Sequence, residues 1–208
     1  MEKFIRHSGV TAALLQDNID TDAIIPSREM KAVSKHGLGA GLFAGWRYLT
    51  PGGRDANPDF VLNRSEYAGT SILLSGDNFG CGSSREHAVW ALLEFGIRAI
   101  IAESFGSIFF NNCVRNGILP LVLKKDEIVT LAAHADSDPA TNRLVIDLEK
   151  LTVCAGRETY SFTLEPGPRD MLLQGLDPIG QTLLLEPQIA TFEVADRERR
   201  PWAYPRGN

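Results

Sequence analysis

Short apolar runs alternate with longer helical patterns between residues 71 and 135. Three of the runs have the length and apolar content of buried strands, and they lie at 71–74, 99–102 and 118–123. Each run is followed by a segment with apolar residues at helical spacing, at 84–95, 106–115 and 126–135. Gly96 and Gly117 sit where helix stops are expected. This β-α-β-α-β order with short connections predicts an α/β fold, in which helices flank a parallel sheet.

The chain after residue 140 has a different pattern. Short strand-like segments joined by turns predict a small antiparallel section, at 143–147, 151–154 and 159–164. Two helical segments are expected after it, at 168–176 and 180–192. We expect a single domain over residues 1–195 and a loosely ordered tail over 196–208, in which Pro201 and Pro205 disfavour regular structure.

A glycine-rich segment near 35–58 predicts a flexible loop that is too rich in glycine for a regular element. Its aromatic residues, Phe43, Trp46 and Tyr48, argue against full disorder, because large aromatic side chains need a packing partner.

The composition is that of an ordinary globular protein, with 44% hydrophobic and 23% charged residues. A net charge of -5 argues against a nucleic-acid partner. No apolar run approaches the length of a membrane span, and the first residues lack a signal-peptide pattern, so we expect a cytoplasmic location. Cys81, Cys113 and Cys154 form no metal-binding motif, so we expect no metal and no cofactor bound by this chain alone.

The turn that follows residues 71–76 has the most informative chemistry, with the sequence GCGSSREH at 80–87. A helix that begins here directs its unpaired N–H groups and its positive end toward an anion. Arg85 can hold a carboxylate through two parallel hydrogen bonds. In parallel sheets such turns lie at the carboxyl ends of the strands, where ligands bind. We therefore expect a site for a small substrate that carries carboxylates.

Several residues near this turn have two interpretations. Ser83 or Ser84 is either a helix cap or a hydroxyl that Arg85 and the helix start make more acidic. Asp20 and Asp22 either cap the next element or bind a metal or an arginine. His87 is favoured as a structural residue. The turn matches neither a hydrolase elbow nor a nucleotide-binding loop.

Longer motifs resemble those of a known family. They are NIDTDAIIP at 18–26, GLF at 41–43, WRY at 46–48, NPDFVLN at 57–63, NFGCGSSREHA at 78–88, FGSIFFNN at 105–112 and GLDPIG at 175–180. In this order they are similar to the small subunits of 3-isopropylmalate dehydratase, which belong to the aconitase superfamily. The resemblance covers residues 1 to about 195.

The resemblance implies the swivelling β/β/α domain of the aconitase type. It implies a larger partner subunit that holds a [4Fe-4S] cluster, and a hydro-lyase that isomerises 2-isopropylmalate to 3-isopropylmalate through 2-isopropylmaleate in leucine biosynthesis. By similarity, Ser83 removes the carbon-bound proton, while Ser84, Arg85 and Asp22 contact the dicarboxylate substrate. Arg28 or Lys31 is a candidate for a second carboxylate contact.

Two alternatives remain open. Residues 27–31 read SREMK and depart from the usual family pattern in a region that shapes the substrate pocket. This departure favours a related hydro-lyase subunit that acts on citraconate/2-methylmalate or homoaconitate. The absence of a self-contained cofactor motif favours a non-catalytic small-molecule-binding module instead.

Overall fold

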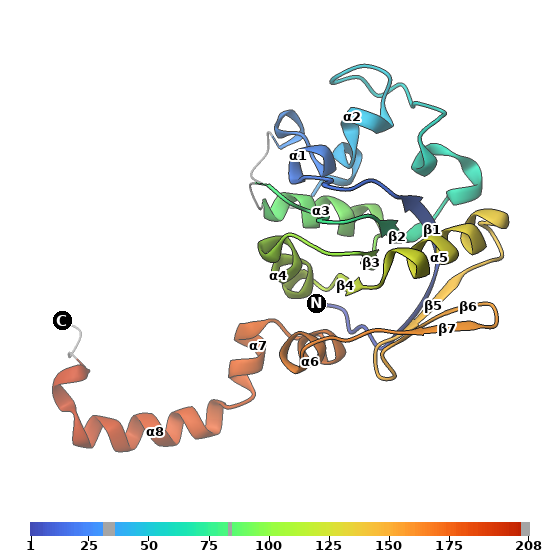
Figure 1. Ribbon diagram of the computed structural model, residues 1–208. Coiled ribbons are helices and arrows are strands. Elements are labelled where there is room, and N and C mark those ends of the chain that lie inside the picture. The colour runs from blue at the N-terminus through green and yellow to red at the C-terminus, as the bar shows by residue number, and fades with distance from the viewer. Residues whose placement is uncertain (31–35, 83–84, 205–208) are drawn as a thin grey trace.

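The computed structural model of the chain describes residues 1–30, 36–82 and 85–204. Within these residues seven strands form one mixed sheet, in the order β4-β3-β2-β1-β5-β6-β7 (Figure 1). The parallel strands are β1 (Arg6–Leu14), β2 (Thr70–Ser75), β3 (Ala99–Ala102) and β4 (Leu119–Val122). The antiparallel strands are β5 (Leu144–Asp147), β6 (Thr152–Ala155) and β7 (Glu158–Ser161). The predicted α/β class is confirmed, and its parallel and antiparallel parts belong to the same sheet.

Strand β1 joins the two parts because its two halves pair differently. Residues 6–9 pair antiparallel with β5, whereas residues 10–14 pair parallel with β2. The register shifts between Val10 and Thr11, and an irregularity of this kind bends a strand. The apolar second half of β1 is visible in the sequence, but its more polar first half, RHSG, carries no strand pattern.

Helices cover both faces of the parallel strands. On one face, Leu73 and Ile100 belong to the core under α3 (Glu86–Phe95). On the other face, their neighbours Ile72 and Ile101 pack in the core under α5 (Lys125–Ser137). Helix α4 (Ser107–Asn116) contributes to both cores. Burial on both faces explains why these strands read as continuous apolar runs.

The predicted ends of these elements are close to the observed ones. Gly96 and Gly117 end α3 and α4 in the left-handed conformation, at φ 112° and 90°. Strand β3 has the predicted bounds. Helix α3 begins at Glu86 with Arg85 as its N-cap residue. The predicted first helical residue, Ser84, lies outside the described residues.

The segment between β1 and β2 consists of loops and short helices. These are α1 (Thr21–Ile24), η1 (Ser27–Glu29), η2 (Gly39–Gly41), α2 (Ala44–Arg47), η3 (Val61–Asn63) and η4 (Ser65–Tyr67). The glycine-rich segment therefore contains regular turns of helix, which its glycine content does not predict. Phe43 explains their presence, because it is fully buried and stacks on Trp46 with ring centroids 5.6 Å apart.

The C-terminal region leaves the body of the protein. Helix α6 (Pro166–Gln174) packs on the core through Leu172, and α7 (Pro178–Leu183), α8 (Glu186–Arg199) and η5 (Pro201–Ala203) form an arm that extends away (Figure 1). The single helix predicted over 180–192 is wrong. The chain breaks at Leu184 and Leu185 because Pro187 lies in the first turn of α8 and cannot continue a preceding helix.

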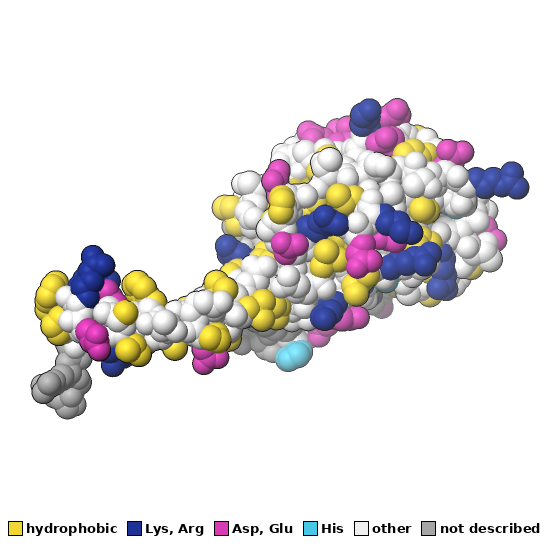
Figure 2. Space-filling view, turned by 90° about the horizontal axis from the view of Figure 1, so that it is seen from below, with side chains coloured by type: hydrophobic (Ala, Val, Ile, Leu, Met, Phe, Trp, Pro, Cys, Tyr) yellow, Lys and Arg dark blue, Asp and Glu magenta, His cyan; other side chains and the backbone are white. Residues whose placement is uncertain are grey.

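Helix α8 crosses residue 195, so helical structure continues into the segment expected to be loosely ordered. The Asp196 carboxylate accepts hydrogen bonds from Arg200 and Tyr204 there. Figure 2 shows apolar side chains along the arm. In this segment Leu184, Phe192 and Trp202 are 62%, 60% and 76% exposed. No helix in the described part of the chain has both the length and the apolar character needed to cross a bilayer.

Candidate active site

Loops from the carboxyl ends of β1, β2 and β3 meet at one edge of the sheet. The Gly80 N–H donates to the Ile19 carbonyl at 2.7 Å, and the Thr21 N–H donates to the Cys81 carbonyl at 3.1 Å. On the other side, the Gly106 N–H donates to the Phe79 carbonyl at 2.9 Å. The turn after β2 is therefore held between its two neighbours, at the edge where ligands of parallel sheets bind.

Glycine is required at two points in this arrangement. Gly80 has a φ of 73°, and a Cβ atom on it would overlap the Phe109 ring. A Cβ on Gly106 would lie 2.7 Å from the Gly80 carbonyl oxygen. Gly82, two residues further along the turn, also has a positive φ, of 89°.

The two aspartates near the turn have separate roles. Asp20 caps α1, because its Oδ1 accepts a hydrogen bond from the Ala23 N–H at 2.7 Å. Asp22 forms an ion pair with the Arg85 guanidinium. The two alternatives left by the sequence, capping and holding an arginine, are thus both realised, by different residues.

Arg85 and Asp22 are accessible to a ligand. The side chain of Arg85 is 30% exposed and that of Asp22 is 56% exposed. A guanidinium has donors on several sides, and it binds a planar carboxylate through a fork of two N–H groups. Arg85 is the N-cap residue of α3, so its positive charge lies at the positive end of that helix.

Arg28 lies in a different local environment. Its Nε is 3.5 Å from the carboxylate of Glu29, and Arg54 contacts the same carboxylate at 2.6 Å. The Glu29 side chain is only 7% exposed under these two guanidinium groups. Glu29 was not among the predicted site residues, because its only signal is its position between Arg28 and the glycine-rich segment. Three other predicted site residues, Ser83, Ser84 and Lys31, lie outside the described residues.

The remaining polar candidates have structural partners or lie apart. The His87 ring packs against Trp90 with centroids 4.8 Å apart, which fits the structural role favoured by the sequence. Cys113 is fully buried, and burial raises the pKa of its thiol. Cys81 lies in the turn itself and Cys154 on β6. Among the described residues no three His, Cys, Asp or Glu side chains form a group that could hold a metal ion.

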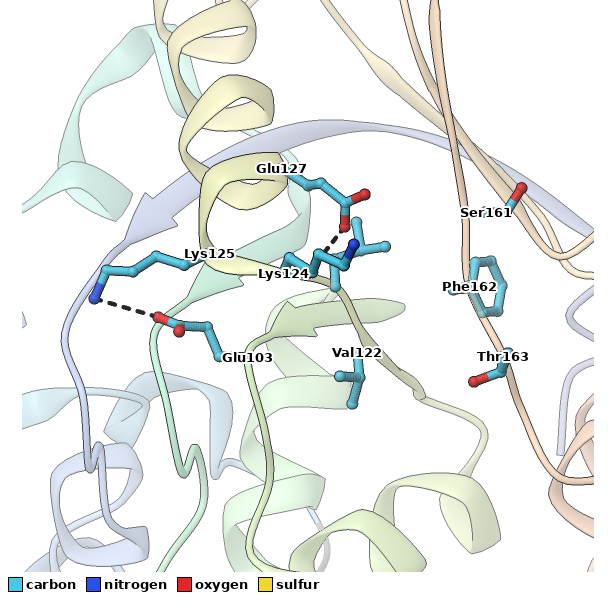
Figure 3. Close-up of a pocket in the computed structure, with 9 residues that line it drawn as sticks. Glu103, Val122, Lys124, Lys125, Glu127, Ser161, Phe162 and Thr163 are labelled. Atoms are coloured by element: carbon cyan, nitrogen blue, oxygen red, sulfur yellow. Dashed lines mark hydrogen bonds and ion pairs between the residues drawn. The ribbon is translucent and has the colours of Figure 1, made fainter.

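Two pockets of about 600 Å³ lie apart from Arg85 and Asp22, and neither residue lines them. One, of about 580 Å³, separates the outer strands of the curled sheet, with Val122 of β4 facing Phe162 and Thr163 after β7 (Figure 3). Both carboxylates that line it have partners, since Glu103 contacts Lys125 at 3.6 Å and Glu127 accepts a hydrogen bond from the Lys124 N–H as it caps α5.

The second pocket, of about 600 Å³, is formed by two of the family-like motifs and the end of β1. Trp46 and Tyr48 come from the first motif, and Asn57 and Phe60 come from the second. The Asn57 side chain donates to the Trp46 carbonyl at 3.0 Å, which joins the two segments. Residues that are separated in the sequence thus form one aromatic wall.

Comparison with known proteins gives a consistent result. The family model for the aconitase C-terminal domain matches residues 1–126. A 3-isopropylmalate dehydratase small subunit from Cupriavidus necator is 60% identical over 205 residues, which cover 98% of this chain and 99% of that protein. The chain belongs to the family of 3-isopropylmalate dehydratase small subunits. Another small subunit of this name, from Agrobacterium fabrum, is 49% identical over 98% of the chain and 100% of its own length.

The structure is also similar to a crystal structure of 3-isopropylmalate dehydratase from Methanocaldococcus jannaschii. The two share 27% sequence identity with a TM-score of 0.65, over 91% of this chain and 99% of that one. This likeness and the aconitase match confirm the aconitase-type domain expected from the sequence.

The two family matches divide the small subunit into regions. The aconitase match ends at residue 126, so it contains the parallel strands and the loops that carry Arg85 and Asp22. A second model describes the C-terminal domain of the 3-isopropylmalate dehydratase small subunit. It matches residues 179–206 and so covers most of the arm. The arm is therefore a feature of 3-isopropylmalate dehydratase small subunits.

Proposed function

We propose that this chain is the small subunit of a 3-isopropylmalate dehydratase. This hydro-lyase converts 2-isopropylmalate to 3-isopropylmalate through 2-isopropylmaleate, as a step of leucine biosynthesis. The observation that carries the proposal is the 60% identity to a small subunit of this name over nearly the full length of both chains.

The residues of this chain bind the substrate and move its proton. Arg85 holds a substrate carboxylate in its guanidinium fork, and Asp22 orients that guanidinium. The Ser83 alkoxide accepts the proton from the substrate carbon and becomes a neutral hydroxyl, and Ser84 contacts the substrate beside it. Support comes from their place in the chain, because Ser83 and Ser84 directly precede Arg85 and the first turn of α3. Arg28 or Lys31 supplies the second carboxylate contact.

The partner in this proposal is a large subunit that carries a [4Fe-4S] cluster. When bound, the cluster supplies a Lewis acid for the leaving hydroxyl group. The cysteines of this chain fit such a division of labour, because Cys113 is buried in the core while Cys81 and Cys154 lie on separate elements. The cytoplasmic location expected from the sequence stays a prediction, as do the absence of nucleic-acid and membrane partners.

Reconstitution tests the proposal. The purified chain is mixed under anaerobic conditions with the large subunit encoded in the same genome, and turnover of 2-isopropylmalate is measured. We expect neither subunit alone to be active and the mixture to be active. Ser83→Ala should abolish turnover while the subunits still associate. Ser65→Ala is the matched control, because its hydroxyl lies on η4 and donates to the neighbouring Glu66.

Two results would contradict the assignment. Near-normal rates with Ser83→Ala would remove Ser83 as the proton acceptor. A mixture that turns over 2-methylmalate or homoaconitate in preference to 2-isopropylmalate would favour the related hydro-lyases instead. The charged side chains of Arg28 and Glu29 in the departing segment are the observation that favours this second candidate.

A further inference from the structure

Two asparagines adopt the left-handed backbone conformation in the loops that form the candidate site. Asn18, after β1, and Asn78, after β2, both have a φ of 57°. Among the described residues, only two other non-glycine residues have a positive φ, Phe43 and Leu151. The left-handed conformation is unfavourable for a residue with a Cβ, and least so for asparagine.

The side chains of Asn18 and Asn78 bond directly to one another. The Nδ2 atom of Asn78 donates to the Oδ1 atom of Asn18 at 2.7 Å. The two backbones are joined at the same place, because the Asn18 N–H donates to the Asp77 carbonyl at 2.8 Å. The Asn78 N–H donates to Ser104 Oγ, in the loop after β3, at 2.9 Å. The amide pair thus links the loops after β1 and β2 at the point where both turn.

This amide pair belongs to a series of contacts between the two loops. Before it, the Asp77 N–H donates to Asp17 Oδ1 at 2.8 Å. After it come the bond between Gly80 and Ile19 and then the bond between Thr21 and Cys81. The series ends at the ion pair between Asp22 and Arg85. A shift of one loop against the other at the asparagines would therefore change the position of Arg85 relative to Asp22.

Backbone conformation alone does not explain asparagine at both positions. Glycine adopts a φ of about 57° without steric penalty, and several glycines of this chain have a positive φ, among them Gly69 and Gly80. Asparagine adds a side-chain amide, which can donate and accept hydrogen bonds between the loop after β1 and the loop after β2. The retained side chains therefore indicate a role for the amide–amide bond.

We propose that Asn18 and Asn78 are positioning residues, whose amide pair sets the spacing of the loops that carry Asp22 and Arg85. The inference rests on the proposed function, since it acts on the substrate carboxylate through Arg85. Neither asparagine is required to touch the substrate. Without the pair, the guanidinium meets the carboxylate at a less favourable angle, and a misplacement of this kind lowers binding and rate.

The test uses the complete enzyme, reconstituted from both subunits. Asn18→Gly and Asn78→Gly keep the backbone conformation and remove the amide bond. Each should lower kcat/KM about five- to tenfold, the effect of losing roughly one hydrogen bond, mainly through a higher KM. The double variant should lose no more than either single variant, because the bond is already absent. Asn142→Gly controls for the loss of a side-chain amide away from the site, since Asn142 Nδ2 donates to the His134 carbonyl and to Ser137 Oγ at the end of α5.

Aspartate variants provide a rescue that does not depend on glycine. Asn18→Asp alone keeps an acceptor for Asn78 and should retain most of the activity. The double variant Asn18→Asp with Asn78→Asp places two carboxylates face to face, and their repulsion should cause a loss of activity.

Three results would overturn the proposal. They are wild-type KM values in the glycine variants, losses that multiply in the double variant, and a lower melting temperature with unchanged kinetics. Wild-type subunits that show no turnover when mixed would instead contradict the proposed function, so the two failures are distinguishable.

Discussion

Arg85 and Asp22 form an ion pair that connects the loop after β2 to the loop after β1. The pair brings a cation to the end of the sheet while leaving both side chains partly exposed. A partly exposed ion pair contributes little to the stability of the folded chain. The placement of Arg85 beside Asp22 is therefore better explained by ligand binding than by folding.

Arg85→Lys should impair catalysis without unfolding the protein. Lysine keeps the charge but cannot form the planar fork, so we expect kcat/KM of the reconstituted enzyme to fall at least about tenfold. Steady-state kinetics with 2-isopropylmalate measure this. Arg157→Lys, in the exposed turn between β6 and β7, should leave kcat/KM unchanged. A wild-type KM in the Arg85 variant would show that the guanidinium does not hold the substrate.

Gly80→Ala should destabilise the folded chain more than Gly69→Ala. Both glycines have a positive φ, of 73° and 75°, so both variants strain the backbone. Only Gly80 faces the Phe109 ring, whereas nothing lies within 4 Å of a Cβ on Gly69. We expect an additional loss of about 1–3 kcal/mol in the free energy of unfolding for Gly80→Ala, measured by urea denaturation. Equal losses in the two variants would mean that the turn can move away from Phe109.

Acidification should release the anchor between α3 and the glycine-rich segment. Hydrogen bonds from the Gly37 and Gly39 N–H groups, at 2.6 and 2.7 Å, lower the pKa of Glu94 from its usual 4.5. The charged carboxylate therefore stabilises the folded chain above pH 4.5, and this stabilisation is lost as the pH falls through the lower folded pKa. In NMR titrations the Gly37 and Gly39 amide signals should shift with a midpoint below 4.5, and they should not do so in Glu94→Gln. A midpoint at or above the usual value would contradict the anchor.

Removal of the arm should leave the body folded. In the described chain the last buried apolar side chain is Leu172, and α8 packs mainly on the short helix η5 that follows it. A chain that ends at Asp177 should therefore melt within a few degrees of the full chain, measured by circular dichroism. A chain that ends at Glu165 should be strongly destabilised, because it loses Leu172 and the bond from the Phe4 N–H to the Leu172 carbonyl. A large loss on removing the arm alone would show that the body depends on it.

The core of the fold could be predicted from the sequence because local and tertiary signals agree there. Strand β3 is an apolar run that is buried on both faces, and Gly96 and Gly117 end their helices as expected. The break before α8 also had a signal, Pro187, that a purely periodic interpretation overlooked. The first half of β1 could not be found, because its pairing with β5 depends on a strand far along the chain.

The site could be predicted only in part. Arg85 and Asp22 stand out individually, but their ion pair depends on β1 and β2 being neighbours in a parallel sheet. The bond between Asn18 and Asn78 has no sequence signal, since neither residue is unusual in a loop. Glu29 looks like an ordinary surface residue, and only the folded chain covers it with Arg28 and Arg54.

The arm carries a built-in fluorescent probe. Trp46 and Trp90 pack against the core of the body, whereas Trp202 is 76% exposed near the far end of the arm. Tryptophan emission moves to shorter wavelength when the indole leaves water. In a Trp46→Phe, Trp90→Phe background, Trp202 would be the remaining tryptophan, and its emission wavelength would report whether the end of the arm is in water or covered by another molecule.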